Sequence, residues 1–211
     1  MSNFKSLNDL DKKMLKYINF RNGFFIEMGA NDGVNQSNSF YYDKSLGWNG
    51  VLVEPTHRFD SLIKNRSKPN NILLNEACCS FEHEGSIIEF EYCDLMTSCT
   101  SLETDVPQDH TKKGAIWLQK NEHVYSFKKR GVSLQSLLDK NNCPNQIDFF
   151  SLDTEGLEIE ILKGIDFSSY RFSYILIESR SLDKLTSFLN GFNYSFVEKL
   201  SKHDYLYKFN Q

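Results

Sequence analysis

The sequence has 211 residues, of which 40% are hydrophobic and 25% are charged, with a formal net charge of -4. This composition excludes disordered and fibrous classes, and the length suits one domain with a sizeable core, which we expect over residues 1–211. The slightly acidic balance provides no broad basic field, so nucleic acid is not an expected partner.

The cysteines and the N-terminal sequence indicate the cellular compartment in which we expect the protein. The 5 cysteines show no Cys-x-x-Cys spacing, which argues against a zinc site and a disulfide framework. The polar start, MSNFKSLNDLDKK, lacks the apolar core of a signal peptide, and no run of about 18 apolar residues occurs. We therefore expect a reduced, cytoplasmic protein without a membrane span.

The N-terminal segment, residues 1–22, is expected to contain a helix over about residues 7–19 that packs on the domain. Its apolar residues recur at helical spacing. They are Leu7, Leu10, Met14 and Ile18.

A buried strand is predicted next, in the stretch FFIEMGANDG. The apolar residues from Phe24 to Ile26 end in Glu27 and are followed by Gly29 and Gly33. Glycine permits a positive φ and a close backbone approach, so the turn suits a bound nucleotide. A strand-to-helix turn also needs glycine for structural reasons alone.

Strands and helices then alternate. The expected elements are a helix at 37–46, a strand at 51–53, a helix at 56–65 and a strand from 72 to about 78. A strand at 86–92 follows, bounded by Gly85. From residue 93 to 131 the periodicity fails, and we expect an irregular lid or acceptor loop there, with Trp117 and Tyr125 suited to stacking on a sugar.

The last part of the chain repeats the alternation. We expect a helix capped by Ser133, a strand at 147–152, a helix at 155–163, a strand at 174–177, a helix at 182–189, and a hairpin of 192–197 with 205–209. The order predicts an α/β protein with an open, doubly wound sheet covered on both faces.

Four predicted strands finish with an acid, namely Glu27, Glu54, Asp153 and Glu178. Ligands of such sheets bind outside the carboxyl ends of the strands, so these side chains are expected to share one edge. Glu54 suits the two hydroxyls of a ribose. Because a pyrophosphate beside Glu27 would be repelled, the pattern favours a cationic nucleoside such as S-adenosylmethionine, although a nicotinamide-dependent oxidoreductase shares the glycine turn and distal acid.

Asp153 is the candidate for proton removal from a hydroxyl, or for holding a cation. With Glu178 it offers the oxygen ligands that magnesium and manganese prefer. Glu155 lies in the predicted first helical turn, where it also favours the helix dipole. The alternative bases are histidines, with His203 near the closing hairpin and His110 or His123 in the lid.

Several segments resemble the FkbM family of S-adenosylmethionine-dependent methyltransferases. They are FIEMGANDGVNQSN, GWNGVLVEP, NEACC and IDFFSLDTEGLEIEILKGIDF, within roughly Gly23 to Phe196. The resemblance implies a Rossmann-like, seven-stranded, mostly parallel sheet whose last strand is antiparallel. It also implies O-methylation of a hydroxyl, frequently on a sugar or a glycan.

Carried over by position, the resemblance implies a cofactor site of seven residues, namely Glu27, Gly29, Asn31, Gly33, Ser37, Glu54 and Ala77. Ala77 would neighbour the adenine. Asp153 would activate the acceptor with Glu155 in support, and residues 96–98 of the lid would approach the cofactor. A methyltransferase-like scaffold that only binds a partner is the non-enzymatic alternative.

Overall fold

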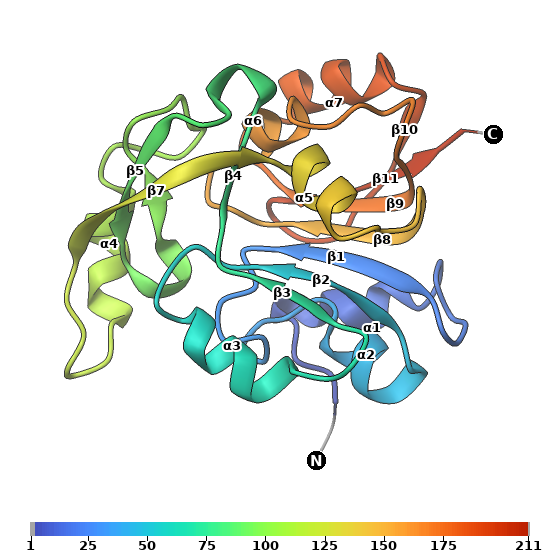
Figure 1. Ribbon diagram of the computed structural model, residues 1–211, viewed down its shortest axis with the longest axis horizontal. Helices are drawn as coiled ribbons and strands as arrows, with labels where there is room; N and C mark the ends of the chain where they lie inside the picture. The colour runs from blue at the N-terminus through green and yellow to red at the C-terminus, as the bar shows by residue number, and fades with distance from the viewer. Residues whose placement is uncertain (1–2, 211) are drawn as a thin grey trace.

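A seven-stranded sheet runs through the centre of the protein, with its strands in the order β10-β11-β9-β8-β1-β2-β3 (Figure 1). The computed structural model describes residues 3–210, so the ends of the expected single domain, residues 1, 2 and 211, lie outside the described residues. Parallel pairing links β3, β2, β1, β8 and β9. The last strand, β11, is antiparallel to both of its neighbours, as the resemblance implied.

The strands of this sheet form from the apolar runs read in the sequence. Their bounds are β1 Phe24–Met28, β2 Asn49–Val53, β3 Ile72–Leu74, β8 Gln146–Leu152, β9 Arg171–Glu178, β10 Tyr194–Lys199 and β11 Asp204–Phe209. Central strands buried on both faces need apolar side chains at successive positions. Val51, Leu52 and Val53 of β2, for example, are all buried.

Helices cover both faces of the sheet (Figure 1). On one face lie α1 Leu10–Met14, α2 Phe40–Leu46 and α3 Phe59–Arg66, and on the other lie α5 Leu134–Lys140, α6 Glu158–Leu162 and α7 Leu182–Asn190. Each face has its own hydrophobic core, because alternate residues of each strand point to opposite sides. Phe25 and Phe149 join the first core, and Ile26 and Phe150 join the second.

A second, four-stranded sheet lies beside the main sheet and carries α4 His110–Gly114 (Figure 1). Its strands are β4 Ala77–Cys79, β5 Ile87–Tyr92, β6 Ser98–Cys99 and β7 Tyr125–Ser133. Short 3-10 turns connect these elements; they are η2 Phe81–His83, η3 Asp94–Met96 and η4 Ala115–Trp117.

The second sheet corrects two sequence predictions. The strand expected from 72 to about 78 is in fact two, because β3 ends in the main sheet and β4 leaves it to pair with β7. The lid expected to be irregular to residue 131 ends in the long strand β7, which pairs antiparallel with β5. In β7 partly buried and exposed residues alternate, but Lys129 occupies one inward position, so the apolar signal was weak.

Four predicted helices differ from the expected bounds. The helices expected from residues 37 and 56 begin at Phe40 and Phe59. The N-terminal helix ends at Met14, and positive φ angles of 55° at Asn8 and Asp9 separate α1 from the 3-10 turn η1 Leu7–Asp9. The helix predicted from residue 155 begins at Glu158. Glu155 has a φ of 52° and belongs to the turn before α6, so its carboxylate is placed by the turn and not by a helix face.

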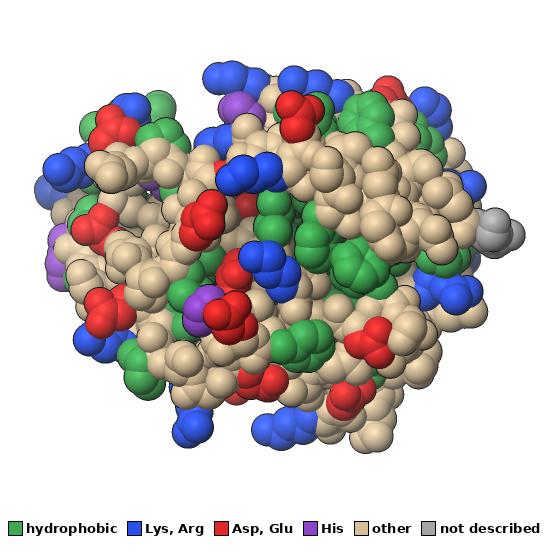
Figure 2. All heavy atoms as spheres, turned by 90° about the horizontal axis from the view of Figure 1, so that it is seen from above, with side chains coloured by type: hydrophobic (Ala, Val, Ile, Leu, Met, Phe, Trp, Pro, Cys, Tyr) green, Lys and Arg blue, Asp and Glu red, His purple; other side chains and the backbone are tan. Residues whose placement is uncertain are grey.

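The surface agrees with the mixed composition. On the face shown in Figure 2, acidic and basic side chains are interspersed. Among residues 3–210, no helix is long and apolar enough to cross a membrane.

Candidate functional site

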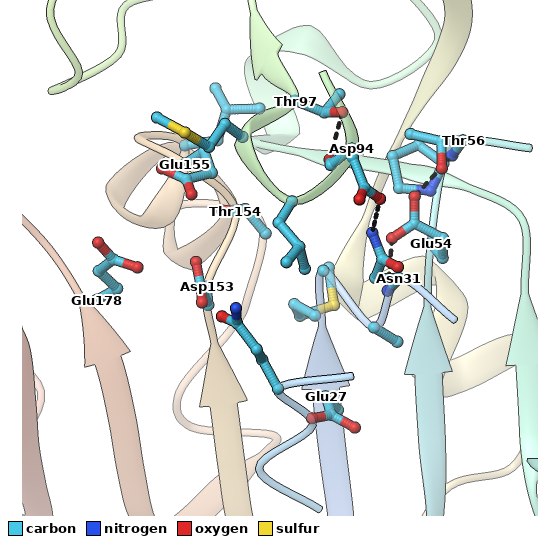
Figure 3. Close-up of a pocket in the computed structure, with 18 of the residues that line it drawn as sticks. Glu27, Asn31, Glu54, Thr56, Asp94, Thr97, Asp153, Thr154, Glu155 and Glu178 are labelled. Carbon is cyan, nitrogen blue, oxygen red and sulfur yellow. Dashed lines mark hydrogen bonds between the residues drawn. The ribbon is translucent and has the colours of Figure 1, made fainter. Parts of the chain in front are cut away.

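A cavity of about 600 Å³ opens at the carboxyl ends of the parallel strands. Its walls come from the turn after β1, the ends of β2, β8 and β9, the start of β4, and the lid segment around α4. Figure 3 shows acids from several of these elements facing the same space. The strand-end acids Glu27, Glu54, Asp153 and Glu178 all line this cavity, as the sequence predicted.

The glycine turn brings the ends of β1 and β8 into close contact. Gly29 has a φ of 75°, and a Cβ at this position would collide with the carbonyl oxygen of Asp153. Gly29 therefore allows the candidate cofactor turn and the candidate catalytic acid to adjoin. Gly33 has a different role, since its absent side chain makes room for Leu62 and Arg66 and it is not among the cavity-lining residues described.

Glu27 supports the turn from below. Its buried carboxylate accepts hydrogen bonds from Ser37 Oγ at 2.8 Å, Ser39 Oγ at 2.6 Å and the Asn38 backbone N–H at 2.7 Å, and lies 3.6 Å from Arg66. The oxygens expected to face the cofactor thus already have protein partners. Glu27 and Ser37 shape the cavity floor chiefly by holding residues 37–39 in place.

Glu54 is held with part of its hydrogen-bonding capacity free. One carboxylate oxygen accepts the backbone N–H of Asn31 and the other that of Thr56, both at 2.8 Å. The side chain is 4% exposed, and burial raises its pKa despite these bonds. The Thr56 side chain also hydrogen-bonds to this carboxylate. A carboxylate offers about four lone-pair positions, so about one remains for a donor from a ligand.

Asn31 links Glu54 to the lid. Its amide donates to Asp94 Oδ1 at 3.1 Å (Figure 3). Arg58 donates to the same oxygen at 2.9 Å. Arg58 also contacts Glu122 at 2.5 Å. Asp94 was not identified from the sequence, because its place beside Asn31 depends on contacts between segments far apart in the chain.

The wall between Glu54 and the lid is largely apolar. Ala77 lines it as expected, together with Cys78, Phe90, Leu95 and Met96. Of the lid residues expected near the cofactor, Met96 and Thr97 line the cavity, and the described lining does not include Ser98. Such a wall suits the flat face of a nucleobase.

Three acids form a group at the other end of the cavity. Asp153 follows β8, Glu155 lies in the next turn, and Glu178 ends β9, with one carboxylate oxygen of each within 4.8 Å of the others. Burial and the neighbouring acids raise the pKa of Asp153 well above its usual range, and burial and Glu155 raise that of Glu178 to about 7. Arg180 partly offsets this charge, at 3.4 Å from Glu155 and 3.5 Å from Glu178.

The three candidate histidines lie in different parts of the structure. His110, the first residue of α4, lines the cavity with its Nε2 atom 2.9 Å from Glu155 Oε2. His203 lies in the turn between β10 and β11, outside the described cavity lining, and the His123 ring lies 5.8 Å from that of Tyr125, tilted by 54°. The cavity therefore favours His110 over His203 as the histidine that meets a ligand.

The two lid aromatics also differ. Trp117 lines the cavity and is 77% exposed. Tyr125 stacks on Tyr92 with ring centroids 4.8 Å apart and hydrogen-bonds to His57 at 2.8 Å, so it stabilises the second sheet. Only Trp117 of this pair is free to stack on a ligand.

Glu158, beneath the acid group, makes stability depend on pH. It accepts three hydrogen bonds from Thr154 and Gly156, yet burial raises its pKa from 4.5 to about 7. The folded state thus binds a proton more tightly than the unfolded state. The stabilisation is complete below pH 4.5 and is lost as the pH rises to about 7, at a cost of roughly 3 kcal/mol.

Glu158→Gln retains the accepting oxygen and removes the titration. Urea unfolding at pH 5 and pH 8 is expected to show a smaller loss of stability in this variant than in the wild type, whereas the exposed Glu103→Gln should behave as the wild type. Equal losses in all three proteins would show that Glu158 titrates normally.

A comparison with family models matches residues 27–207 to the methyltransferase FkbM domain. A comparison with curated proteins found no match. The matched segment begins at Glu27 and includes the cavity-lining acids from all four strand ends.

Proposed function

Because this chain belongs to the FkbM methyltransferase family, we propose that it is an S-adenosylmethionine-dependent O-methyltransferase acting on a hydroxyl of a sugar, in a glycan or glycoconjugate. The proposal includes the doubly wound, Rossmann-like arrangement typical of such enzymes. The order and directions of the seven strands, and helices on both faces, support it.

The observation that carries the cofactor assignment is the state of Glu54. This buried carboxylate has two backbone donors, the Thr56 side chain as a third partner and about one unfilled acceptor position, beside a glycine turn and an apolar wall. A ribose hydroxyl is a donor that fits this position. The many acids of the cavity suit a sulfonium and an ammonium group better than a pyrophosphate.

The cofactor supplies an activated methyl group, so the protein has to align the acceptor and remove a proton. The backbone carbonyl of Asp153 adjoins Gly29 and Asp153 lines the same cavity, which supports a role for its carboxylate in activating the acceptor. Burial and the neighbouring acids raise the pKa of Asp153, which makes its ionised form a stronger base than an ordinary carboxylate. Glu155 supports this end of the cavity through its contacts with His110 and Arg180.

The acceptor end also carries an aromatic surface. Trp117 is largely exposed and lines the cavity, and aromatic rings of this kind stack on the apolar faces of sugars. A sugar lying on Trp117 would extend its hydroxyls toward the acids of the same cavity.

Calorimetry with S-adenosylhomocysteine tests the assignment. We expect the wild type to bind it and Glu54→Ala to bind about 10- to 100-fold more weakly, since each hydrogen bond to a charged group contributes about 1.5–3 kcal/mol. Asp60→Ala, which removes an exposed acid from α3, should bind as the wild type.

Three outcomes would contradict the proposal. Equal binding by Glu54→Ala removes the ribose assignment, and a rise in melting temperature with NAD but not with S-adenosylhomocysteine favours an oxidoreductase. If the cofactor binds but methyl-labelled cofactor labels no member of a glycan panel, sugar O-methylation is wrong. Transfer of the labelled methyl group to a glycan would show that the protein is an enzyme and not a binding module.

A further inference from the structure

The acid group of Asp153, Glu155 and Glu178 lacks balancing charge. Its three carboxylates face one guanidinium, that of Arg180, and no other Arg or Lys side chain is among the described residues of the cavity lining. Without a cation, protonation relieves part of the repulsion, as the raised pKa values of Asp153 and Glu178 indicate. Fully ionised, the three acids carry two more negative charges than Arg180 balances. A divalent cation would balance this difference.

The distances within the group suit one ion. Oxygen ligands lie about 2.1 Å from magnesium, so neighbouring ligands of an octahedral ion are about 3 Å apart and opposite ones about 4.2 Å apart. The candidate oxygens of the three acids all lie within 4.8 Å of one another, so the widest separation would have to close by at most about 0.6 Å on binding. They come from two strand ends and one turn of the rigid sheet, and Figure 3 shows Asp153, Glu155 and Glu178 around a common space.

An independent observation comes from the lid. His110 is 5% exposed, and its Nε2 atom has no hydrogen-bond partner among the described residues, although Glu155 Oε2 is only 2.9 Å away. A buried polar atom without a partner is unfavourable and indicates a missing ligand group. A water molecule bound to an ion at the three acids would supply such a partner.

We propose that Asp153, Glu155 and Glu178 bind one divalent cation of the magnesium or manganese class, with His110 contacting a ligand in its outer shell. This adds Glu155 and His110 to the pair expected from the sequence. The remaining coordination positions face the cavity, where they would take water or adjacent hydroxyls of an acceptor. The inference deepens the proposed function at its acceptor end, but it rests on the acid group and not on the cofactor.

Manganese alone serves as the probe. Titration of the protein with Mn²⁺, followed by electron paramagnetic resonance of the free ion, is expected to show one site. Asp153→Asn and Glu178→Gln should each weaken binding at least 10-fold, as a lost charged ligand implies. Glu76→Gln, which changes another acid of the same cavity, should bind as the wild type.

Thermal unfolding checks that the variants fold, and removal of one of several repelling charges is expected to raise the melting temperature without metal. Absence of a site in the wild type, or unchanged binding in both acid variants, would overturn the proposal. The proposal would also be overturned if the wild type bound glucosamine but not Mn²⁺, and if the same substitutions abolished glucosamine binding. The acids would then recognise an ammonium group. S-adenosylhomocysteine binding is measured without metal, so its result tests the proposed function independently of the metal site.

Discussion

Replacing Arg66 with methionine is expected to lower the free energy of unfolding by about 3–5 kcal/mol. Arg66 is fully buried and donates to Asp43 at 2.7 Å, to the Gly33 carbonyl oxygen at 2.9 Å and to Ser39 Oγ at 2.8 Å. Methionine fills much of the volume but leaves the carboxylates of Asp43 and Glu27 buried with fewer partners. The cost of that uncompensated charge dominates the effect.

Urea unfolding at neutral pH measures the change, with Lys184→Met as the control. Lys184 makes a largely exposed pair with Glu103 at 3.4 Å, and such pairs contribute about 0–1 kcal/mol. A loss of less than 1 kcal/mol in Arg66→Met would mean that water reaches the buried carboxylates. Because Glu27, Ser37 and Gly33 all contact Arg66, the variant should also bind S-adenosylhomocysteine more weakly than the wild type where it remains folded.

Gly29→Ala is expected to cost about 3 kcal/mol or more in stability and to abolish measurable S-adenosylhomocysteine binding. Two effects add at this position. The backbone has a φ of 75°, which disfavours a side chain, and the new Cβ would collide with the Asp153 carbonyl oxygen. Relief of the collision requires the ends of β1 and β8 to separate, which displaces the cofactor turn from Asp153.

Gly85→Ala separates these two effects. Gly85 has a φ of 84°, but a Cβ there would meet only the Arg130 guanidinium at 3.5 Å. This variant should lose about 1 kcal/mol and retain binding. Similar losses in the two variants, with binding intact in both, would show that the close approach of β1 and β8 is unimportant for the site.

Features set by local chemistry were read correctly from the sequence. Buried runs such as Val51–Val53 and Phe149–Leu152, in which Ser151 is the one polar residue, predict strands buried on both faces. The positions of Glu54 and Asp153 directly after such runs place them at one sheet edge. Ser133 accepts the Ser136 backbone N–H and caps α5 as expected. The motifs also identified the family that the comparison with family models later matched.

The lid and the partners of the charged residues required the tertiary structure. The strand β7 is stabilised by its pairing with β5, more than 30 residues away in the chain. Its Lys129 occupies a partly buried position, so apolar and polar residues do not alternate clearly in the sequence. The contacts of Arg66 with Glu27 and of His110 with Glu155 likewise join distant segments. Periodicity and motif spacing report on a residue's own neighbourhood, whereas these contacts depend on how the whole chain packs.

One physical reason explains why some features could be predicted from the sequence and others required the tertiary structure. Secondary structure and strand-end positions follow from side-chain size, polarity and backbone preference within a few residues, so the sequence by itself determined the sheet, the glycine turn and the edge where acids gather. Which oxygens remain free, as at Glu54, and which are already paired, as at Glu27, is decided by donors that folding brings from elsewhere. Only the tertiary structure therefore distinguished Glu54, which keeps acceptor capacity free, from Glu27, whose oxygens are paired within the turn.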